Sequence, residues 1–180
     1  MKKLFGCLLI TISLAAVVNA QTEKGDWLVG GSFSLNTTEG NTSISLMPNV
    51  GHFFAKGFAA GAEMLISTAK LGEIRNTSLG VGPFARYYFE LKEPIFKPYV
   101  HGAFSVASIR TKAFGNSETE TATGFLLGLG GAYFINNNVA IDGLAGYNYS
   151  KVENSDGNGG FVFRIGFQVH LLGSEVRGGN

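Results

Sequence analysis

The stretch that most constrains the fold is residues 161–172, which reads FVFRIGFQVHLL. Apolar side chains occupy every second position: Phe161, Phe163, Ile165, Phe167, Val169 and Leu171. The positions between them carry Val162, Arg164, Gly166, Gln168 and His170. Because side chains of a β-strand alternate between its two faces, the pattern predicts a strand with one uniformly apolar face. A soluble sandwich would bury that face, whereas a membrane barrel would turn it to lipid.

The first residues have the features of a secretory signal peptide. Lys2 and Lys3 precede an apolar run, and the Val-Asn-Ala segment at 18–20 supplies a site that a signal peptidase reads. The alternative, a membrane anchor, is disfavoured because the run is short for a spanning helix. The only cysteine, Cys7, lies in this segment, so the mature chain should lack disulfides and thiol chemistry. We predict a signal peptide over residues 1–20 and one domain over residues 21–180.

The composition is unusual for a soluble domain. The chain holds 26 glycines and 15 phenylalanines, and only 15% of its residues are charged. A long uncharged stretch, residues 122–141, contains four glycines and three consecutive asparagines, which disfavour a helix. Without Lys2 and Lys3, 12 basic residues face 13 acidic ones, so nothing indicates a nucleic-acid partner. If the mature chain spans a membrane, it must do so as a closed barrel of strands.

Eight segments with alternating apolar and polar residues are expected to be strands. They lie near residues 26–37, 42–54, 58–67, 76–89, 97–108, 121–134, 139–149 and 160–172. Pro48 and Pro83 fall inside two of them and are interpreted as bulge or strand-end positions, because proline removes a ladder donor. The other connections are short, but residues 68–75, 109–120 and 150–159 form longer or more polar segments, which predict loops. Short turns at one end and longer loops at the other are typical of outer-membrane barrels.

Aromatic residues on the apolar faces gather near the strand ends that should lie in the periplasm. They are Trp27, Phe54, Phe58, Tyr87, Phe89 and Tyr133. Tyr147, Tyr149 and Phe161 gather near the opposite rim. Clustering at one depth indicates an interfacial girdle, although aromatic residues also favour strands in general.

At this point the chain resembles the small eight-stranded outer-membrane barrels, the family that includes outer membrane protein X and the membrane domain of outer membrane protein A. The resemblance rests on residues 47–54 (MPNVGHFF), 82–89 (GPFARYYF), 97–100 (KPYV) and the last strand. It implies an all-β fold, an eight-stranded antiparallel up-and-down transmembrane β-barrel. It also implies a monomer in the bacterial outer membrane, in contact with its lipid.

The last strand is also similar to the signal read by the barrel-assembly machinery. The residues that fit this signal are Arg164, Gly166, Val169 and Leu171. Such chains often end on an aromatic residue, whereas this one continues through residues 173–180. The resemblance implies the assembly machinery as a partner. We expect the tail to be dispensable for insertion because it is polar, glycine-rich and outside the strands.

The expected barrel interior carries charges. An eight-stranded barrel is just wide enough for its own side chains. The polar-phase residues predict a lumen ion-pair network of Glu63, Arg86, Asp142, Arg164, His101 and Gln168. Because unpaired buried charges are costly, we expect Arg86 to pair with Glu63 on the neighbouring strand and Arg164 with Asp142. Such a network predicts a sealed polar plug, and a gated channel is the alternative.

No catalytic or ligand-binding pattern stands out. His52, His101 and His170 are the only histidine bases, and His52 is expected on the outward face near the periplasmic rim. No serine, histidine and carboxylate converge at one expected depth. Glu153, Asp156 and Asn158 could hold a weak calcium ion, but this segment is more simply a turn. We expect no enzyme activity, no cofactor and no metal.

The expected function is therefore structural or surface interaction, with a filled polar lumen and outer loops that contact host or surface ligands. Three alternatives stay open. A narrow conduit for small hydrophobic solutes would be favoured by a sideways gap in the barrel wall. A lipid-modifying enzyme would need a histidine, a serine and a carboxylate within hydrogen-bond reach. A secreted soluble barrel would have its faces reversed.

The mature protein is expected to require detergent for extraction and to migrate differently on gels when boiled and unboiled. The reason is that eight outward apolar faces need lipid or detergent around them. Fractionation and gel mobility measure this directly. Recovery as a detergent-free soluble monomer from the periplasm would contradict the barrel.

Overall fold

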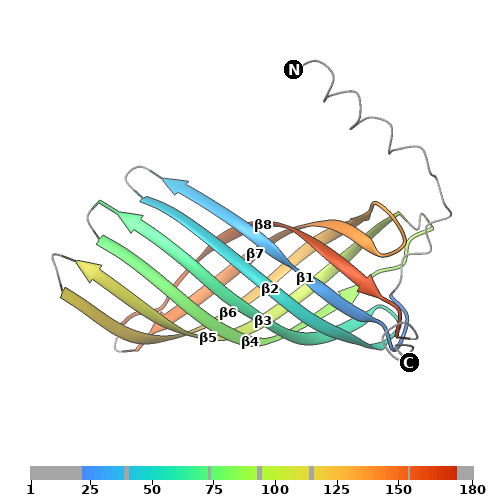
Figure 1. Ribbon diagram of the computed structural model, residues 1–180, viewed down its shortest axis with the longest axis horizontal. Helices are drawn as coiled ribbons and strands as arrows, with labels where there is room; N and C mark the ends of the chain where they lie inside the picture. Colours follow the sequence, from blue (N-terminus) through green and yellow to red (C-terminus); the bar gives the residue numbers. More distant parts are fainter. Residues whose placement is uncertain are drawn as a thin grey trace, which may run out of the picture.

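The chain folds into a closed antiparallel β-barrel in which each strand pairs with its neighbours in sequence and β1 pairs with β8 (Figure 1). The computed structural model describes residues 22–38, 41–72, 74–92, 95–113, 116–153 and 155–173. The expected signal peptide and the polar tail at 174–180 lie outside the described residues. The strands are β1 (Trp27–Thr38), β2 (Asn41–Ala55), β3 (Phe58–Leu71), β4 (Ile74–Tyr88), β5 (Phe96–Ala113), β6 (Asn116–Phe134), β7 (Val139–Val152) and β8 (Asn158–Leu171). The expected fold class is confirmed.

No helix among the described residues is long and apolar enough to cross a membrane.

The barrel has two unlike ends. At the terminal end, β1 begins, β8 ends and β2, β4 and β6 connect to the strands that follow them (Figure 1). Gly173 N donates to Asp26 Oδ1 at 3.2 Å there, and Lys97 Nζ donates to Thr22 Oγ1 at 2.6 Å. At the hairpin end, the other four connections join β1 to β2, β3 to β4, β5 to β6 and β7 to β8. These two names are used below.

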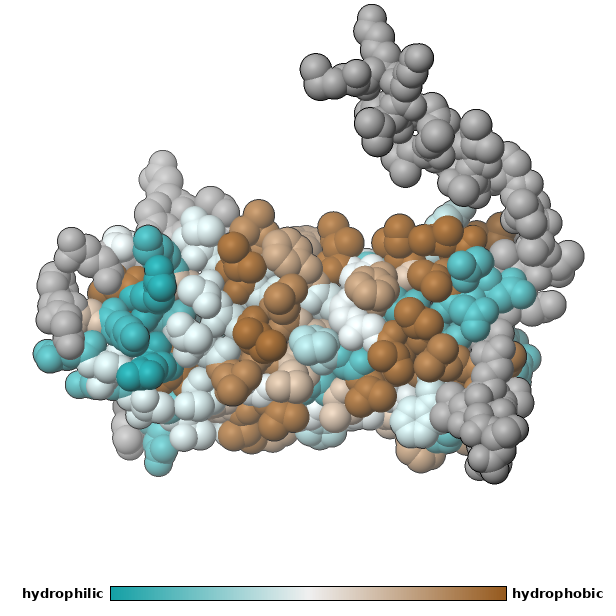
Figure 2. Space-filling model, viewed as in Figure 1, coloured by the Kyte–Doolittle hydropathy of each residue, from teal (hydrophilic) through white to brown (hydrophobic). Residues whose placement is uncertain are grey.

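The alternation of apolar and polar residues expected for the last strand is present in β8. Phe161, Phe163, Ile165 and Phe167 are exposed on the outside, while Arg164, Gln168 and His170 are buried inside. Apolar residues form much of the outer surface, from the middle of the barrel to the terminal end, and hydrophilic residues gather at the hairpin end (Figure 2). An apolar surface of this extent is not stable in water, so it identifies the lipid-facing band.

The longer loops expected at residues 68–75 and 109–120 are wrong, whereas the one expected at 150–159 is present as a shorter connection between Val152 and Asn158. Residues 68–71, 109–113 and 116–120 continue the ladders of their strands, so that β5 has 18 residues and β6 has 19. Spanning the apolar layer takes only about 9–11 residues per strand. The polar ends of these strands therefore extend past the band as paired ribbons. We expected loops there because the threonines and serines of these segments are polar, but such residues also fit a strand.

The two prolines are neither bulges nor strand ends. The β2–β3 ladder skips Met47 and Pro48, and the β4–β5 ladder skips Gly82 and Pro83, but the register is unchanged on both sides of each gap. Each proline lacks the N–H that a ladder needs, so pairing is lost locally and resumes at the same offset.

Candidate functional site

The centre of the lumen is the Arg86 guanidinium of β4. Its Nη1 donates to Asp142 Oδ2 at 3.1 Å and to Tyr88 Oη at 3.0 Å. The Tyr99 ring lies under it, with 4.3 Å between Arg86 Cζ and the ring centroid. Tyr99 Oη donates to the same Asp142 oxygen at 2.9 Å. A buried guanidinium is thus matched by a carboxylate and by two aromatic partners, which is what its desolvation requires.

The polar contacts continue from Arg86 across the lumen. Arg86 Nε donates to His101 Nδ1 at 3.3 Å, which places the imidazole proton on Nε2. That nitrogen lies 3.6 Å from Glu63 Oε2, and Arg164 Nη1 lies 3.6 Å from Glu63 Oε1. All of these side chains are buried. The network therefore links β7, β4, β5, β3 and β8 through side chains alone.

The expected pairing of these charges is wrong. Arg86 pairs with Asp142, and Arg164 pairs with Glu63. Arg86 lies opposite Ala59 in the β3–β4 ladder, four residues from Glu63, which is about 13 Å along a strand. Because barrel strands tilt by about 35–45° around a narrow lumen, side chains at one height can also meet across the barrel from strands that are not neighbours in the sheet. Adjacency in sequence therefore does not identify the partner.

Gln168 was expected in the network but takes no part in it. It is fully buried, yet its amide has no hydrogen-bond partner among the described residues. Its side chain lies against Gly30 of β1, where a Cβ would collide with its Oε1 atom. Gln168 is four residues from Arg164 along β8, about 13 Å nearer the terminal end, and so belongs to a different layer.

Gly166, expected only as part of the assembly signal, has a packing role in the lumen. A Cβ at this position would lie 2.5 Å from Asp142 Oδ1 and from the Gly31 carbonyl oxygen. The bare backbone therefore makes room for the carboxylate that pairs with Arg86. Arg164 also faces the lumen, while Val169 and Leu171 are half-buried. Recognition by the assembly machinery stays a prediction.

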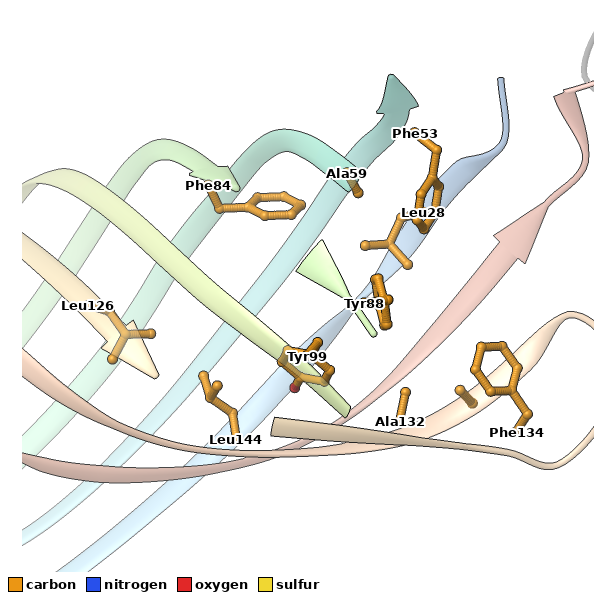
Figure 3. Packing of buried hydrophobic residues seen from close by; sticks show 11 residues of the cluster. Leu28, Phe53, Ala59, Phe84, Tyr88, Tyr99, Leu126, Ala132, Phe134 and Leu144 are labelled. Atoms are coloured by element: carbon orange, nitrogen blue, oxygen red, sulfur yellow. The ribbon is translucent and has the colours of Figure 1, made fainter. Parts of the chain in front are cut away.

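Aromatic side chains fill the lumen on the terminal side of the network. The His170 ring has Phe134 at 5.0 Å, Phe53 at 5.7 Å and Tyr88 at 5.8 Å between centroids. The rings of Phe53, Tyr88 and Phe134 enter the same space from different segments, beside Leu28 and Tyr99 (Figure 3). Their dense packing, together with the network, closes this half of the barrel.

The other half of the lumen is a hollow, here called the vestibule. It measures about 370 Å³ and has Glu63, Arg164, Met47 and Leu126 among its lining residues. Hydroxyl groups from several strands line it: Ser34, Ser43, Ser45, Ser67, Ser78 and Ser105. Sequence reasoning missed this space. The available signal was the run of small inward residues at the hairpin ends, because a narrow lumen is filled only where its side chains are large.

The expected girdle residues are all exposed and lie on the terminal side of their strands: Trp27, Phe54, Phe58, Tyr87, Phe89 and Tyr133. Phe96 belongs with them, since it begins β5 and pairs with Tyr133. The His52 ring lies 5.0 Å from that of Trp27. Their role as an interfacial girdle stays a prediction.

A row of cations crosses the hairpin end. In the ladders, Lys70 of β3 lies opposite Arg75 of β4, and Arg75 lies opposite Lys112 of β5. All three side chains are exposed on the outer face, and Arg110 lies two residues below Lys112. No salt bridge joins this basic row to a carboxylate within the described residues. At the terminal end, by contrast, Lys56 pairs with Glu23 and Glu90 at 3.1 Å, and these hydrogen bonds raise the pKa of Lys56.

Within the described residues, no group of three or more His, Cys, Asp and Glu side chains is arranged to hold a metal ion. No hydrogen bond there joins a serine to His52 or His101. Three features remain: the plug, which consists of the Arg86 network and the rings around His170, the vestibule and the basic row.

Comparison with known proteins agrees with this fold. The family described as "Outer membrane protein beta-barrel domain" matches residues 5–170. Neisserial surface protein A is similar in structure, with a TM-score of 0.63 and 19% identity over 81% of this chain and 97% of that one. The N-terminal barrel of OprF from Pseudomonas aeruginosa has a TM-score of 0.56 and 12% identity, covering 82% and 98%. Ail, the attachment invasion locus protein of Yersinia pestis, has a TM-score of 0.51 and 18% identity, covering 82% and 99%. No match was found among curated proteins.

A double-mutant cycle should locate the main ion pair. Arg86→Ala is expected to lower the free energy of unfolding by about 3–5 kcal/mol, because it leaves the Asp142 carboxylate buried and unpaired. Arg86→Ala combined with Asp142→Ala should cost less than the sum of the single changes. Denaturant unfolding in detergent, followed by Trp27 fluorescence, measures both. The matched cycle of Arg86 with Glu63 should show weaker coupling, and stronger coupling there would contradict the cross-lumen pairing.

Proposed function

This chain belongs to the outer membrane protein β-barrel family, and from that premise we propose that it is a sealed outer-membrane protein whose hairpin end binds anionic groups at the cell surface. The observation that carries the proposal is the basic row of Lys70, Arg75 and Lys112. It lies on the polar ribbons that extend past the lipid band, where a barrel can meet other molecules (Figure 2).

The basic row is costly without a ligand. Side chains directly opposite each other in an antiparallel ladder have Cβ atoms about 4.5–5.5 Å apart, and like charges there are destabilising. Two successive pairs of this kind have no carboxylate between them among the described residues. An anion bridging the three side chains would relieve that repulsion, and the Arg75 guanidinium would offer a fork suited to phosphate or sulfate.

The height of the row indicates where the anion would be. Ile66 and Leu79, which face each other four residues below Lys70 and Arg75, are exposed apolar residues of the lipid band. Four residues of a tilted strand rise by about 10 Å, which carries the row out of the apolar core to the level of the lipid headgroups or just beyond them. The anionic group therefore comes either from headgroup phosphates of the outer leaflet or from an acidic polymer lying on the surface.

The filled half of the lumen supports a surface role over passage through the barrel. A solute crossing from the vestibule to the terminal end would have to displace Arg86, His170 and the rings around them. Breaking one partner from a buried ion pair alone costs several kcal/mol. The geometry of the histidines, with His101 held by Arg86 and His52 beside Trp27, likewise supports binding rather than lipid chemistry.

Binding of heparin, used as a soluble sulfated polymer, tests the role of the row. The triple variant Lys70→Gln, Arg75→Gln, Lys112→Gln in detergent should lose affinity by about tenfold, since each exposed ion pair contributes roughly 0.2–1 kcal/mol. Binding should also weaken as salt rises. The second arm of the experiment measures binding of a short-chain anionic lipid to the reconstituted protein. Binding of this lipid without binding of heparin would assign the row to headgroup phosphates.

The control variant removes the same charge elsewhere. Lys24→Gln, Lys92→Gln, Lys151→Gln changes exposed lysines outside the row and should keep wild-type affinity. Equal losses in the two triple variants, or no response to either anion at low salt, would overturn the proposal.

A further inference from the structure

The barrel closes along only part of its final seam. β1 and β8 pair from Trp27 with Leu171 to Phe33 with Ile165, and the ladder ends there. β1 nevertheless continues to Thr38, paired only with β2, and β8 begins at Asn158, paired only with β7. Residues 34–38 and 158–164 are therefore two strand edges, on the hairpin side of this ladder, that do not pair with each other.

The outer side of this gap lies in the apolar band. Leu35 flanks it on β1, and Phe161 and Phe163 flank it on β8. The two phenylalanines are 81% and 73% exposed, the highest values among the large apolar side chains described, compared with 67% for Leu129 in the fully paired wall. Phe161 touches Tyr147 at the rim, so Phe163 lies deeper, at the level of lipid chains.

Unpaired backbone at this depth needs a hydrogen-bonding partner. Lipid chains supply none, and an unsatisfied N–H or C=O in hydrocarbon costs several kcal/mol. Natural barrels avoid the cost by full closure, so an open stretch of seam calls for a specific occupant.

A hollow lies directly behind the gap. It measures about 330 Å³ and is bounded by Ser34 and Ser45 on one side, Asn148 and Ser150 on the other, and residues 158–162 of the free β8 edge. Four of these side chains, Ser34, Ser45, Asn148 and Ser150, also line the vestibule. The seam is thus a sideways opening from the lipid band into the vestibule.

We propose that the β1–β8 seam is a binding site for a single-chain amphiphile with an uncharged, hydroxyl-rich head, which enters from the outer leaflet. The head lies in the vestibule, where it hydrogen-bonds the serines and the free strand edges. The alkyl chain leaves through the gap between Leu35 and Phe163. The site is separate from the basic row on β3, β4 and β5 and does not depend on it.

The chemistry of the lining selects an uncharged head. The polar groups at the seam are hydroxyls and amides, which both donate and accept. Among the described residues, the only charged side chains that line the vestibule are Glu63 and Arg164, which pair with each other. A charged head would therefore lose its hydration without gaining a counter-ion. The Arg164 Nε atom has no hydrogen-bond partner within the described protein and offers one further donor to a neutral acceptor.

The plug makes this a dead-end site. Beyond the vestibule floor lie the Arg86 network and the aromatic rings around His170. An amphiphile can enter and leave sideways without crossing the membrane. A sideways gap was the feature expected to favour a solute conduit, and here it opens onto a chamber whose floor is closed by the plug instead.

Photolabelling with an alkyl glucoside that carries a diazirine in its chain tests the site in phosphatidylcholine vesicles. Label should concentrate in residues 34–38 and 158–163. A disulfide in the variant Leu35→Cys, Phe163→Cys should close the gap and lower this labelling by about tenfold, with recovery on reduction. The matched control is Leu79→Cys, Ser108→Cys, which joins two strands that are already paired and should change nothing.

One further variant and one further probe keep the test decisive. Ser45→Trp fills the hollow from inside without altering the outer face, and it should lower labelling to the same degree even if the disulfide forms poorly. An alkyl phosphate probe of equal chain length should label the seam about tenfold less than the glucoside. Label spread evenly over the outward residues, or unaffected by closing the seam, would overturn the site. Equal labelling by the phosphate probe would overturn the uncharged head.

Discussion

The interaction on which the rest of the structure depends is the enclosure of the Arg86 guanidinium. The guanidinium donates hydrogen bonds to Asp142 of β7, His101 of β5 and Tyr88 of its own strand. His101 in turn lies next to Glu63, which pairs with Arg164. A slip of one residue in any of these strands would turn its charged side chain toward lipid and its apolar side chains inward. The network therefore fixes the register of the barrel as well as closing it, because each buried charge is satisfied only in this one alignment.

This enclosure divides the lumen into two halves with different uses. On the terminal side, large rings packed around His170 leave no passage. On the hairpin side, serines leave a chamber whose wall is incomplete where β1 and β8 part. A plug on one side allows the other side to stay open without making the membrane leaky. The polar ribbons beyond the band add an outer surface, with its basic row, that neither half of the lumen disturbs.

The sequence predicted the strands better than the side-chain contacts between different strands. Period-two patterning located all eight strands and assigned Phe163, Arg164 and Ile165 to the correct faces, because facing depends only on the local alternation. It failed on the partners of Arg86 and Arg164, since these depend on strand tilt and stagger, which no single strand encodes. It failed also on the hairpin end, where residues such as Thr68 and Thr111 read as loop by polarity but pair as strand. The partial seam had no signal in any one segment.

Thiol accessibility tests the division of the lumen most directly, because the mature chain is expected to lack cysteine. Single variants Ser67→Cys and Ser105→Cys report on the vestibule, and Ala59→Cys and Ala132→Cys report on the plug. A membrane-impermeant maleimide added to intact cells should modify the two vestibule cysteines rapidly and leave the two plug cysteines unmodified. Equal modification of all four from outside would mean that the Arg86 network does not seal the barrel, and would contradict the account.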